Sequence, residues 1–138
     1  PCLPDTSTLL IIQEGLRHVP PEAVPVIAEH LNLSRAEVHG VISYYHHFHQ
    51  HPLGKTVVQI CRAEACQSVG GDALAAHAVK EIGCDFAETN ADGSVSLEPV
   101  YCLGQCACGP AIMINDDVYA RVTPARLSSL LQKARSKA

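Results

Sequence analysis

Two cysteine pairs constrain this chain most strongly, because each pair follows a short stretch with the composition of a buried strand. A C-x4-C pair begins at Cys61, directly after the β-branched stretch 56–60. A C-x3-C pair begins at Cys102, directly after the strand-like stretch 95–100. If these two strands are neighbours, their ends bring the four thiols into one place. The predicted site consists of Cys61, Cys66, Cys102 and Cys106.

The spacing of these cysteines bears on which metal they hold. Structural zinc sites favour cysteines separated by two residues, a spacing that occurs nowhere in this chain. The absence of this spacing also argues against a thiol-redox enzyme, in which a C-x2-C motif is typical. A loop of four residues is wide enough to wrap a cluster, and glycines at positions 70, 71, 104 and 109 let backbone N–H groups approach the sulfurs. A [2Fe–2S] cluster on four thiolates is the favoured interpretation, and zinc and buried or disulfide-bonded cysteines are the alternatives.

Three of the seven cysteines lie outside these pairs. Cys108 is expected to be a small buried hydrophobic residue beside the site, with a substitute ligand or a redox thiol as the alternative. Cys84 is expected to be a packed thiol and Cys2 an inert one. Because the start of the chain carries no secretory signal, seven cysteines indicate a reducing compartment, and we expect a cytoplasmic location.

Composition excludes several classes of protein. The chain has 138 residues, of which 47% are hydrophobic and 17% charged, which is typical of a globular protein. A net charge of −4 argues against nucleic-acid binding, and no apolar run approaches the length of a membrane span.

The chain is predicted to form an N-terminal helical segment, residues 1–52, and an α/β domain, residues 53–138. Three helices are expected near 9–16, 22–31 and from Ser34, where Ser34 and Glu37 form a capping box. The second part reads as strand 56–60, helix 72–82, two hairpins turning at 90–93 and 115–117, and a last helix opened by Thr123.

The stretches 61–70 and 101–110 resemble the thioredoxin-like [2Fe–2S] ferredoxin family, and the similarity extends from Leu9 to nearly the end of the chain. This family includes the 24-kDa subunit of respiratory complex I, a small subunit of NAD-reducing hydrogenases, and the gamma subunit of NAD-dependent molybdenum formate dehydrogenases. Residues 62–65 and 105–110 are most similar to the formate dehydrogenase gamma subunit.

The resemblance implies a thioredoxin-like domain with an N-terminal helical extension. By position, it places the cluster ligands at Cys61, Cys66, Cys102 and Cys106. It also implies a partner subunit that binds FMN and NAD, and through it a molybdenum- and Fe–S-containing subunit that oxidises formate. The chain is then a non-catalytic electron-transfer subunit of an NAD-dependent formate dehydrogenase, and the N-terminal helices serve docking.

Other functions remain as alternatives. The equivalent subunit of complex I or of an NAD-reducing hydrogenase would carry out the same electron transfer. A zinc-stabilised interaction module would have no redox role. No turnover is expected from the isolated chain, since it lacks the Gly-x-Gly-x-x-Gly turn typical of dinucleotide binding.

Polar residues near these elements have two interpretations each. Arg62 either tempers the negative charge of the cluster or makes an exposed contact. A group of four histidines is expected to lie at a helix end and an interface, with metal binding as the alternative: His46, His47, His49 and His51.

Overall fold

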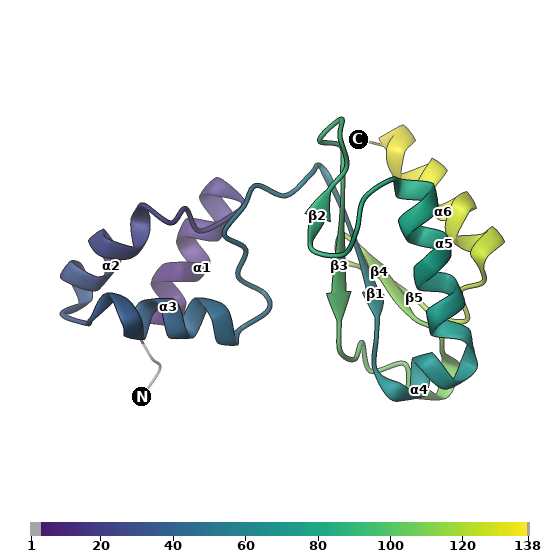
Figure 1. Cartoon of the computed structure of the whole chain (residues 1–138), viewed down its shortest axis with the longest axis horizontal. Helices are drawn as coiled ribbons and strands as arrows, with labels where there is room; N and C mark the ends of the chain where they lie inside the picture. Colours follow the sequence, from purple (N-terminus) through teal and green to yellow (C-terminus); the bar gives the residue numbers. More distant parts are fainter. Residues whose placement is uncertain (1–3, 138) are drawn as a thin grey trace. The chain divides into compact units, whose positions relative to one another are not determined.

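The computed structural model describes residues 4–137 of the chain. The chain divides after Leu53 into two compact units, one residue beyond the boundary expected from the sequence. The first unit is helical, and the second contains a β-sheet with helices (Figure 1). None of the described helices is long and apolar enough to cross a membrane.

The N-terminal unit consists of helices α1 (Pro4–Leu16), α2 (Ala23–Leu31) and α3 (Arg35–Tyr44). Asn32 caps the C-terminal end of α2 in a left-handed backbone conformation, which asparagine tolerates well. Helix α3 begins with the predicted capping box. The Glu37 N–H donates to Ser34 Oγ at 3.2 Å, and the Ser34 N–H donates to the Glu37 carboxylate at 2.8 Å.

The three helices enclose a small apolar core, and one polar side chain fixes the segment that follows them. The core residues are Leu9, Val19, Val24, Ile27, Ala28, Val38, Ile42 and Phe48. Gln13 on α1 donates from Nε2 to the His47 carbonyl at 2.6 Å, and its Oε1 accepts the His49 N–H at 2.9 Å. These two bonds hold the histidine-rich segment against α1.

The second unit is built on a five-stranded sheet in the order β2-β3-β1-β4-β5. The strands are β1 (Thr56–Cys61), β2 (Glu88–Thr89), β3 (Val95–Val100), β4 (Ile112–Ile114) and β5 (Asp117–Tyr119). Strands β1 and β3 are parallel, and every other pairing is antiparallel. The two predicted hairpins, β2–β3 and β4–β5, therefore flank the central strand β1.

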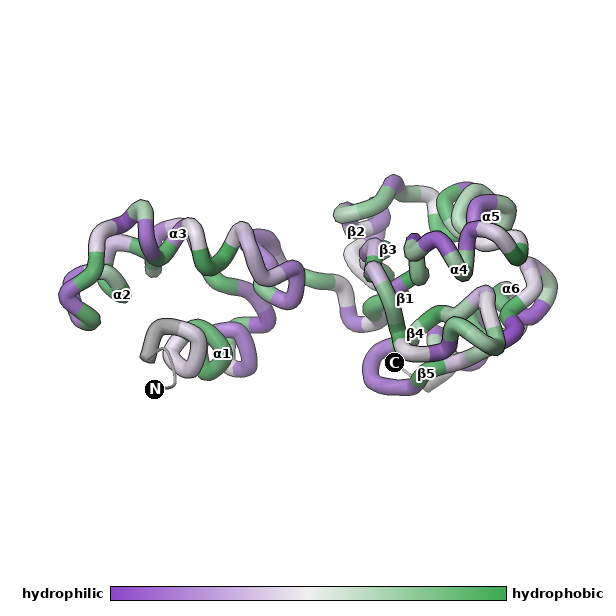
Figure 2. The backbone as a smooth tube through the Cα atoms, turned by 90° about the horizontal axis from the view of Figure 1, so that it is seen from below, coloured by the Kyte–Doolittle hydropathy of each residue, from purple (hydrophilic) through white to green (hydrophobic). Residues whose placement is uncertain are grey.

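One face of this sheet is covered by helices α5 (Asp72–Ile82) and α6 (Pro124–Lys137), as Figure 1 shows. Their apolar sides join alternate strand residues in one buried core, which includes Val58, Leu74, Leu97, Ile112 and Leu127. Figure 2 shows that both helices mix hydrophobic and hydrophilic residues, as expected for helices with one buried side.

Short helical turns complete the unit. Helix α4 (Glu64–Cys66) continues into a π-type turn at Gln67–Gly71 and then into α5, with a kink where Gly70 has φ +99°. A one-turn 3₁₀ helix, η2, spans Cys106–Cys108. The sequence predicted α5, its glycine end at Gly83 and the start of α6, but it missed α4 and this kink. The fold is thus the expected thioredoxin-like α/β domain with N-terminal helices.

Candidate iron–sulfur centre

The two cysteine-bearing loops leave the sheet at the same edge. Strands β1 and β3 are parallel neighbours, and Cys61 lies opposite Val100 in their register. The Arg62 N–H donates to the Val100 carbonyl at 2.7 Å, so pairing continues one residue into the first loop. The sequence-based expectation that the two strands are neighbours is confirmed.

The first cysteine pair is buried. Cys61 ends strand β1, and helix α4 turns the chain so that Cys66 comes back beside it; each residue is 2% exposed. The Cys61 N–H donates to the Ala111 carbonyl at 3.1 Å, and both thiols pack in one small apolar cluster with Ala111. This pair therefore has fixed positions on the protein side of the site.

The second pair is exposed and its thiols are close together. The Sγ atoms of Cys102 and Cys106 are 3.6 Å apart. Two sulfurs on one tetrahedral metal ion, bound at about 2.3 Å, lie about 3.8 Å apart, so this separation fits ligands of a shared ion. The Gly104 N–H donates to Cys102 Sγ at 3.3 Å, as expected from the sequence for a glycine in this loop.

The backbone at Cys102 is unusual, with φ +147° in a residue that has a Cβ. Conformations of this kind carry strain and concentrate at functional sites, where the surrounding structure enforces them. Here the strained residue follows β3 and Tyr101 directly, and its side chain turns toward Cys106.

The four thiols influence one another electrostatically. Hydrogen bonds from the Gly104 N–H and the Cys106 thiol lower the pKa of Cys102, whereas the hydrogen bond with Cys102 and its negative charge raise the pKa of Cys106. The charge of Cys61 also raises the pKa of Cys106, so the two pairs lie within electrostatic reach. Burial, followed by the hydrogen bond with Cys61, raises the pKa of Cys66.

The arrangement of the two thiol pairs suits a two-iron cluster. A [2Fe–2S] cluster spreads four thiolates over two irons, two on each. One buried pair facing one exposed pair meets that requirement, and loading would displace the thiol protons as metal ligation does generally.

Two glycines allow the chain to pass close to Cys66. A Cβ built on Gly71 would lie 2.6 Å from the Cys66 carbonyl oxygen, which no side chain tolerates. A Cβ built on Gly109 would lie 2.9 Å from Cγ2 of Val69 and 3.4 Å from Sγ of Cys66. The role of these glycines is therefore steric, in addition to the N–H contact expected from the sequence.

The remaining cysteines are placed differently. Cys84 is half-buried, packs against the core of the second unit, and donates to the Glu88 carbonyl at 3.6 Å. Cys108 is also half-buried, and its Sγ lies 3.7 Å from Nη2 of Arg121, a contact that sequence reasoning missed. Cys2 lies outside the described residues.

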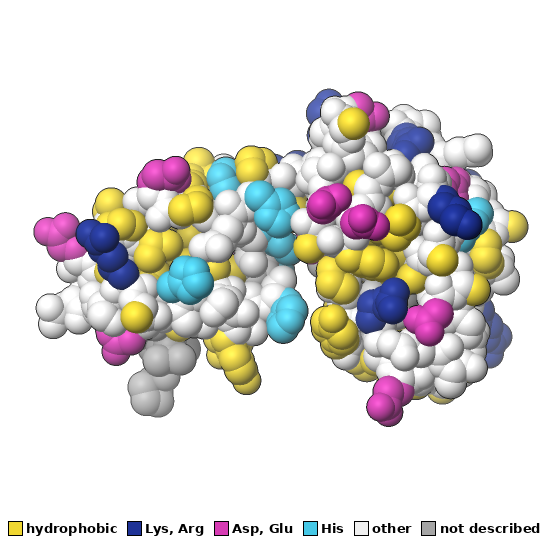
Figure 3. Space-filling model, in the orientation of Figure 1, with side chains coloured by type: hydrophobic (Ala, Val, Ile, Leu, Met, Phe, Trp, Pro, Cys, Tyr) yellow, Lys and Arg dark blue, Asp and Glu magenta, His cyan; other side chains and the backbone are white. Residues whose placement is uncertain are grey.

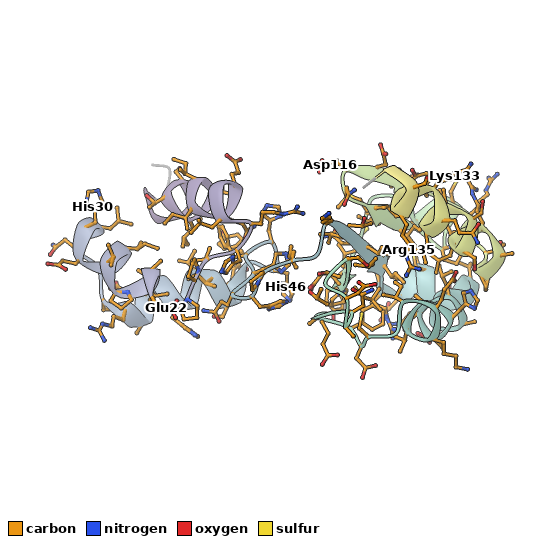
Figure 4. All side chains as sticks on the ribbon, turned by 90° about the horizontal axis from the view of Figure 1, so that it is seen from above. Glu22, His30, His46, Asp116, Lys133 and Arg135 are labelled. Carbon is orange, nitrogen blue, oxygen red and sulfur yellow. The ribbon has the colours of Figure 1, made fainter. Side chains whose placement is uncertain are left out.

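The other polar candidates are accounted for by contacts within their own units. Arg62 forms an ion pair with Asp72 at 3.2 Å and lies 5.3 Å from the centre of the Phe86 ring. His49 is buried, whereas His46 (labelled in Figure 4) is exposed. On the face seen in Figure 3, basic side chains are scattered among acidic ones.

Comparison with known proteins identifies the family. A profile of the family described as thioredoxin-like [2Fe–2S] ferredoxin matches residues 6–135. This chain belongs to that family. The [2Fe–2S] cluster that defines the family is thus the cofactor of the chain, in agreement with the two thiol pairs.

Two curated members of the family show how far the similarity extends. One NADH-quinone oxidoreductase subunit, from Pseudomonas aeruginosa, is 33% identical over 126 residues, which cover 91% of this chain and 76% of that protein. The HndA subunit of the NADP-reducing hydrogenase of Solidesulfovibrio fructosivorans is 34% identical over 120 residues, covering 86% and 70% respectively.

A solved structure has the same fold. An NAD⁺-reducing [NiFe]-hydrogenase in the air-oxidized state superposes with a TM-score of 0.73 and 21% identity. The match covers 94% of this chain but 23% of the hydrogenase chain. At this level of identity the similarity concerns the fold alone.

Proposed function

We propose that this chain is an electron-transfer subunit of an NADH-dehydrogenase-like complex, in which Cys61, Cys66, Cys102 and Cys106 hold the [2Fe–2S] cluster beside a flavin- and NAD-binding partner subunit. The observation that carries this proposal is the convergence of two cysteine pairs at the common end of β1 and β3. When bound, the cluster supplies one-electron redox chemistry.

The two cysteine pairs that hold the cluster differ in their surroundings. The buried pair, Cys61 and Cys66, fixes one side through the core, and the exposed pair, Cys102 and Cys106, faces outward. Val69, in the turn after Cys66, is 53% exposed, and Tyr101, directly before Cys102, is 62% exposed. Exposed apolar side chains around a site are typical of a surface that a partner covers. We therefore place the partner's flavin on the side of the exposed thiols.

The named relatives and the residues of the two cysteine loops both bear on which complex contains this chain. Both named relatives belong to quinone oxidoreductase and hydrogenase complexes, which supports these two as the first candidates. The formate dehydrogenase assignment is the second candidate, carried by residues 62–65 and 105–110. In either case no turnover is expected from the chain alone.

The experiment that tests this proposal is purification of the affinity-tagged full chain from its source cells. A brown protein with about two irons and two sulfides per chain is expected, together with a flavoprotein that reduces dyes with NADH. Molybdenum in the complex would favour formate dehydrogenase, nickel a hydrogenase, and neither metal a quinone oxidoreductase. A colourless chain with one zinc would overturn the electron-transfer function.

A further inference from the structure

A positive charge near an iron–sulfur cluster makes the cluster easier to reduce. The sequence suggests Arg62 as the source of such a charge, whereas the structure points to Arg121. Arg62 follows Cys61 directly, but its guanidinium forms the ion pair with Asp72 and lies over Phe86. The Asp72 carboxylate offsets the charge of Arg62. Arg62 is therefore a poor candidate for tuning the site.

Arg121 is bound to the other cysteine loop through two contacts. Its Nη2 donates to Cys108 Sγ at 3.7 Å, and its backbone N–H donates to the Cys108 carbonyl at 2.8 Å. Arg121 adopts a left-handed backbone conformation, φ +50°, that a residue with a Cβ rarely adopts. The backbone bond joins Arg121 to the loop, and the side-chain contact places its guanidinium beside Cys108.

Cys108 connects this guanidinium to the proposed ligand Cys106. The two cysteines are the ends of the one-turn helix η2, which the Cys108 N–H closes by donating to the Gln105 carbonyl at 2.9 Å. Within the part of the chain that the structure describes, no carboxylate forms an ion pair with Arg121. Among the described residues, Arg121 thus has no carboxylate within ion-pair distance, in contrast to Arg62.

We propose that Arg121 raises the reduction potential of the [2Fe–2S] cluster, and that Cys108 is the positioning residue that holds Arg121 in place. One-electron reduction adds one negative charge to a centre that four thiolates already make negative. A nearby positive charge stabilises the reduced form more than the oxidised form. The sulfur of Cys108 acts as a weak acceptor for the guanidinium rather than as a ligand. This inference rests on the proposed function, in which Cys106 binds the cluster.

The test is a potentiometric titration of the full chain carrying its cluster. Redox mediators and dithionite deliver one electron to each centre, and the EPR signal of the reduced form is recorded at each potential. The variants are Arg121→Gln, which removes the charge; Arg121→Lys, which keeps it; and Cys108→Ala, which removes the anchor. Arg135→Gln is the matched control, because it removes the same charge from the far end of α6 (Figure 4).

We expect Arg121→Gln to raise the ratio of oxidised to reduced centres about threefold or more at the wild-type midpoint, which equals about 28 mV at 59 mV per tenfold. Cys108→Ala should shift the midpoint in the same direction by less, while Arg121→Lys and Arg135→Gln should remain close to wild type. If the Arg121→Gln variant binds no cluster, the midpoint potential of Cys108→Ala tests the inference instead.

Two results would overturn the inference: a midpoint of Arg121→Gln equal to wild type with an intact EPR signal, or an equal shift in Arg135→Gln. Thermal unfolding of each variant separates a change in potential from a change in stability. Failure of the proposed function has a different signature, because the Cys106→Ser variant would then retain the wild-type EPR signal.

Discussion

Gly109 packs directly against Cys66, with its Cα close enough that an added methyl group would lie 3.4 Å from the Cys66 sulfur. The same methyl group would lie 2.9 Å from Val69. The loop that carries the exposed cysteines can therefore close over the buried pair only if position 109 has no side chain.

Gly109→Ala should consequently push η2 away from Cys66. Forced contacts of this kind cost about 1–3 kcal/mol, and here the displacement falls on the cluster site. We expect lower iron content and faster loss of visible absorbance in air. Gly40→Ala is the control, because nothing lies within 4 Å of a Cβ at Gly40 in α3. Equal iron content in both variants would contradict the packing argument.

Replacement of single cysteines by serine should separate ligands from other thiols. A hydroxyl is a hard ligand that substitutes poorly for a thiolate, so the serine variants at Cys61, Cys66, Cys102 and Cys106 should lose or severely alter the EPR signal. Cys84→Ser is the internal control, since this thiol donates to the Glu88 carbonyl and packs against the core of the second unit. Loss of the signal in Cys84→Ser alone would show that the ligand set is wrong.

The stability of the N-terminal unit should fall in mild acid. Burial, together with the positive charges of His51 and His47, lowers the pKa of His49 from 6.5 to about 4. Between these values the unfolded chain binds a proton that the folded chain excludes. Stability is thus fully present above about pH 6.5 and decreases toward pH 4, by about 1–2 kcal/mol between pH 7 and pH 5.

Urea unfolding followed by circular dichroism at pH 7 and pH 5 measures this difference. A His49→Gln variant should lose most of the pH dependence, because its side chain does not titrate. An unchanged dependence in that variant would assign the effect to other groups.

Substitutions at two residues of α1 should distinguish an effect on folding from an effect on docking. Leu9 is fully buried in the helical core, whereas Ile11 is 69% exposed. Leu9→Ala should destabilise the N-terminal unit by about 2–5 kcal/mol. Ile11→Glu should leave its unfolding midpoint nearly unchanged and weaken co-purification with the flavin subunit, as expected if the N-terminal helices serve docking. Undiminished co-purification of Ile11→Glu would argue against this face of α1 as the contact.

Local chemistry allowed much of the fold to be predicted from the sequence. The capping box at Ser34, the glycine end of α5 at Gly83 and the Thr123 start of α6 each depend on neighbouring residues alone. The neighbouring positions of β1 and β3 were also predictable, because the two cysteine pairs needed a common edge.

Features that depend on tertiary contacts were not predictable in this way. Helix α4 is three residues long, and the kink at Gly70 interrupts any periodic pattern. The contact between Arg121 and Cys108 joins residues 13 positions apart, on either side of a hairpin. The sequence pointed to Arg62, which follows Cys61 directly, and only the fold shows that Arg62 forms an ion pair with Asp72.

The two thiol pairs differ in accessibility, because Cys61 and Cys66 are buried whereas Cys102 and Cys106 are exposed. We therefore expect a carrier protein that delivers iron and sulfide to meet Cys102 and Cys106 first, and we expect oxygen and chelators to attack the loaded centre from the same side. A partner subunit that covers these two cysteines would close that route, so the lifetime of the cluster would depend on the assembled complex and not on this chain alone.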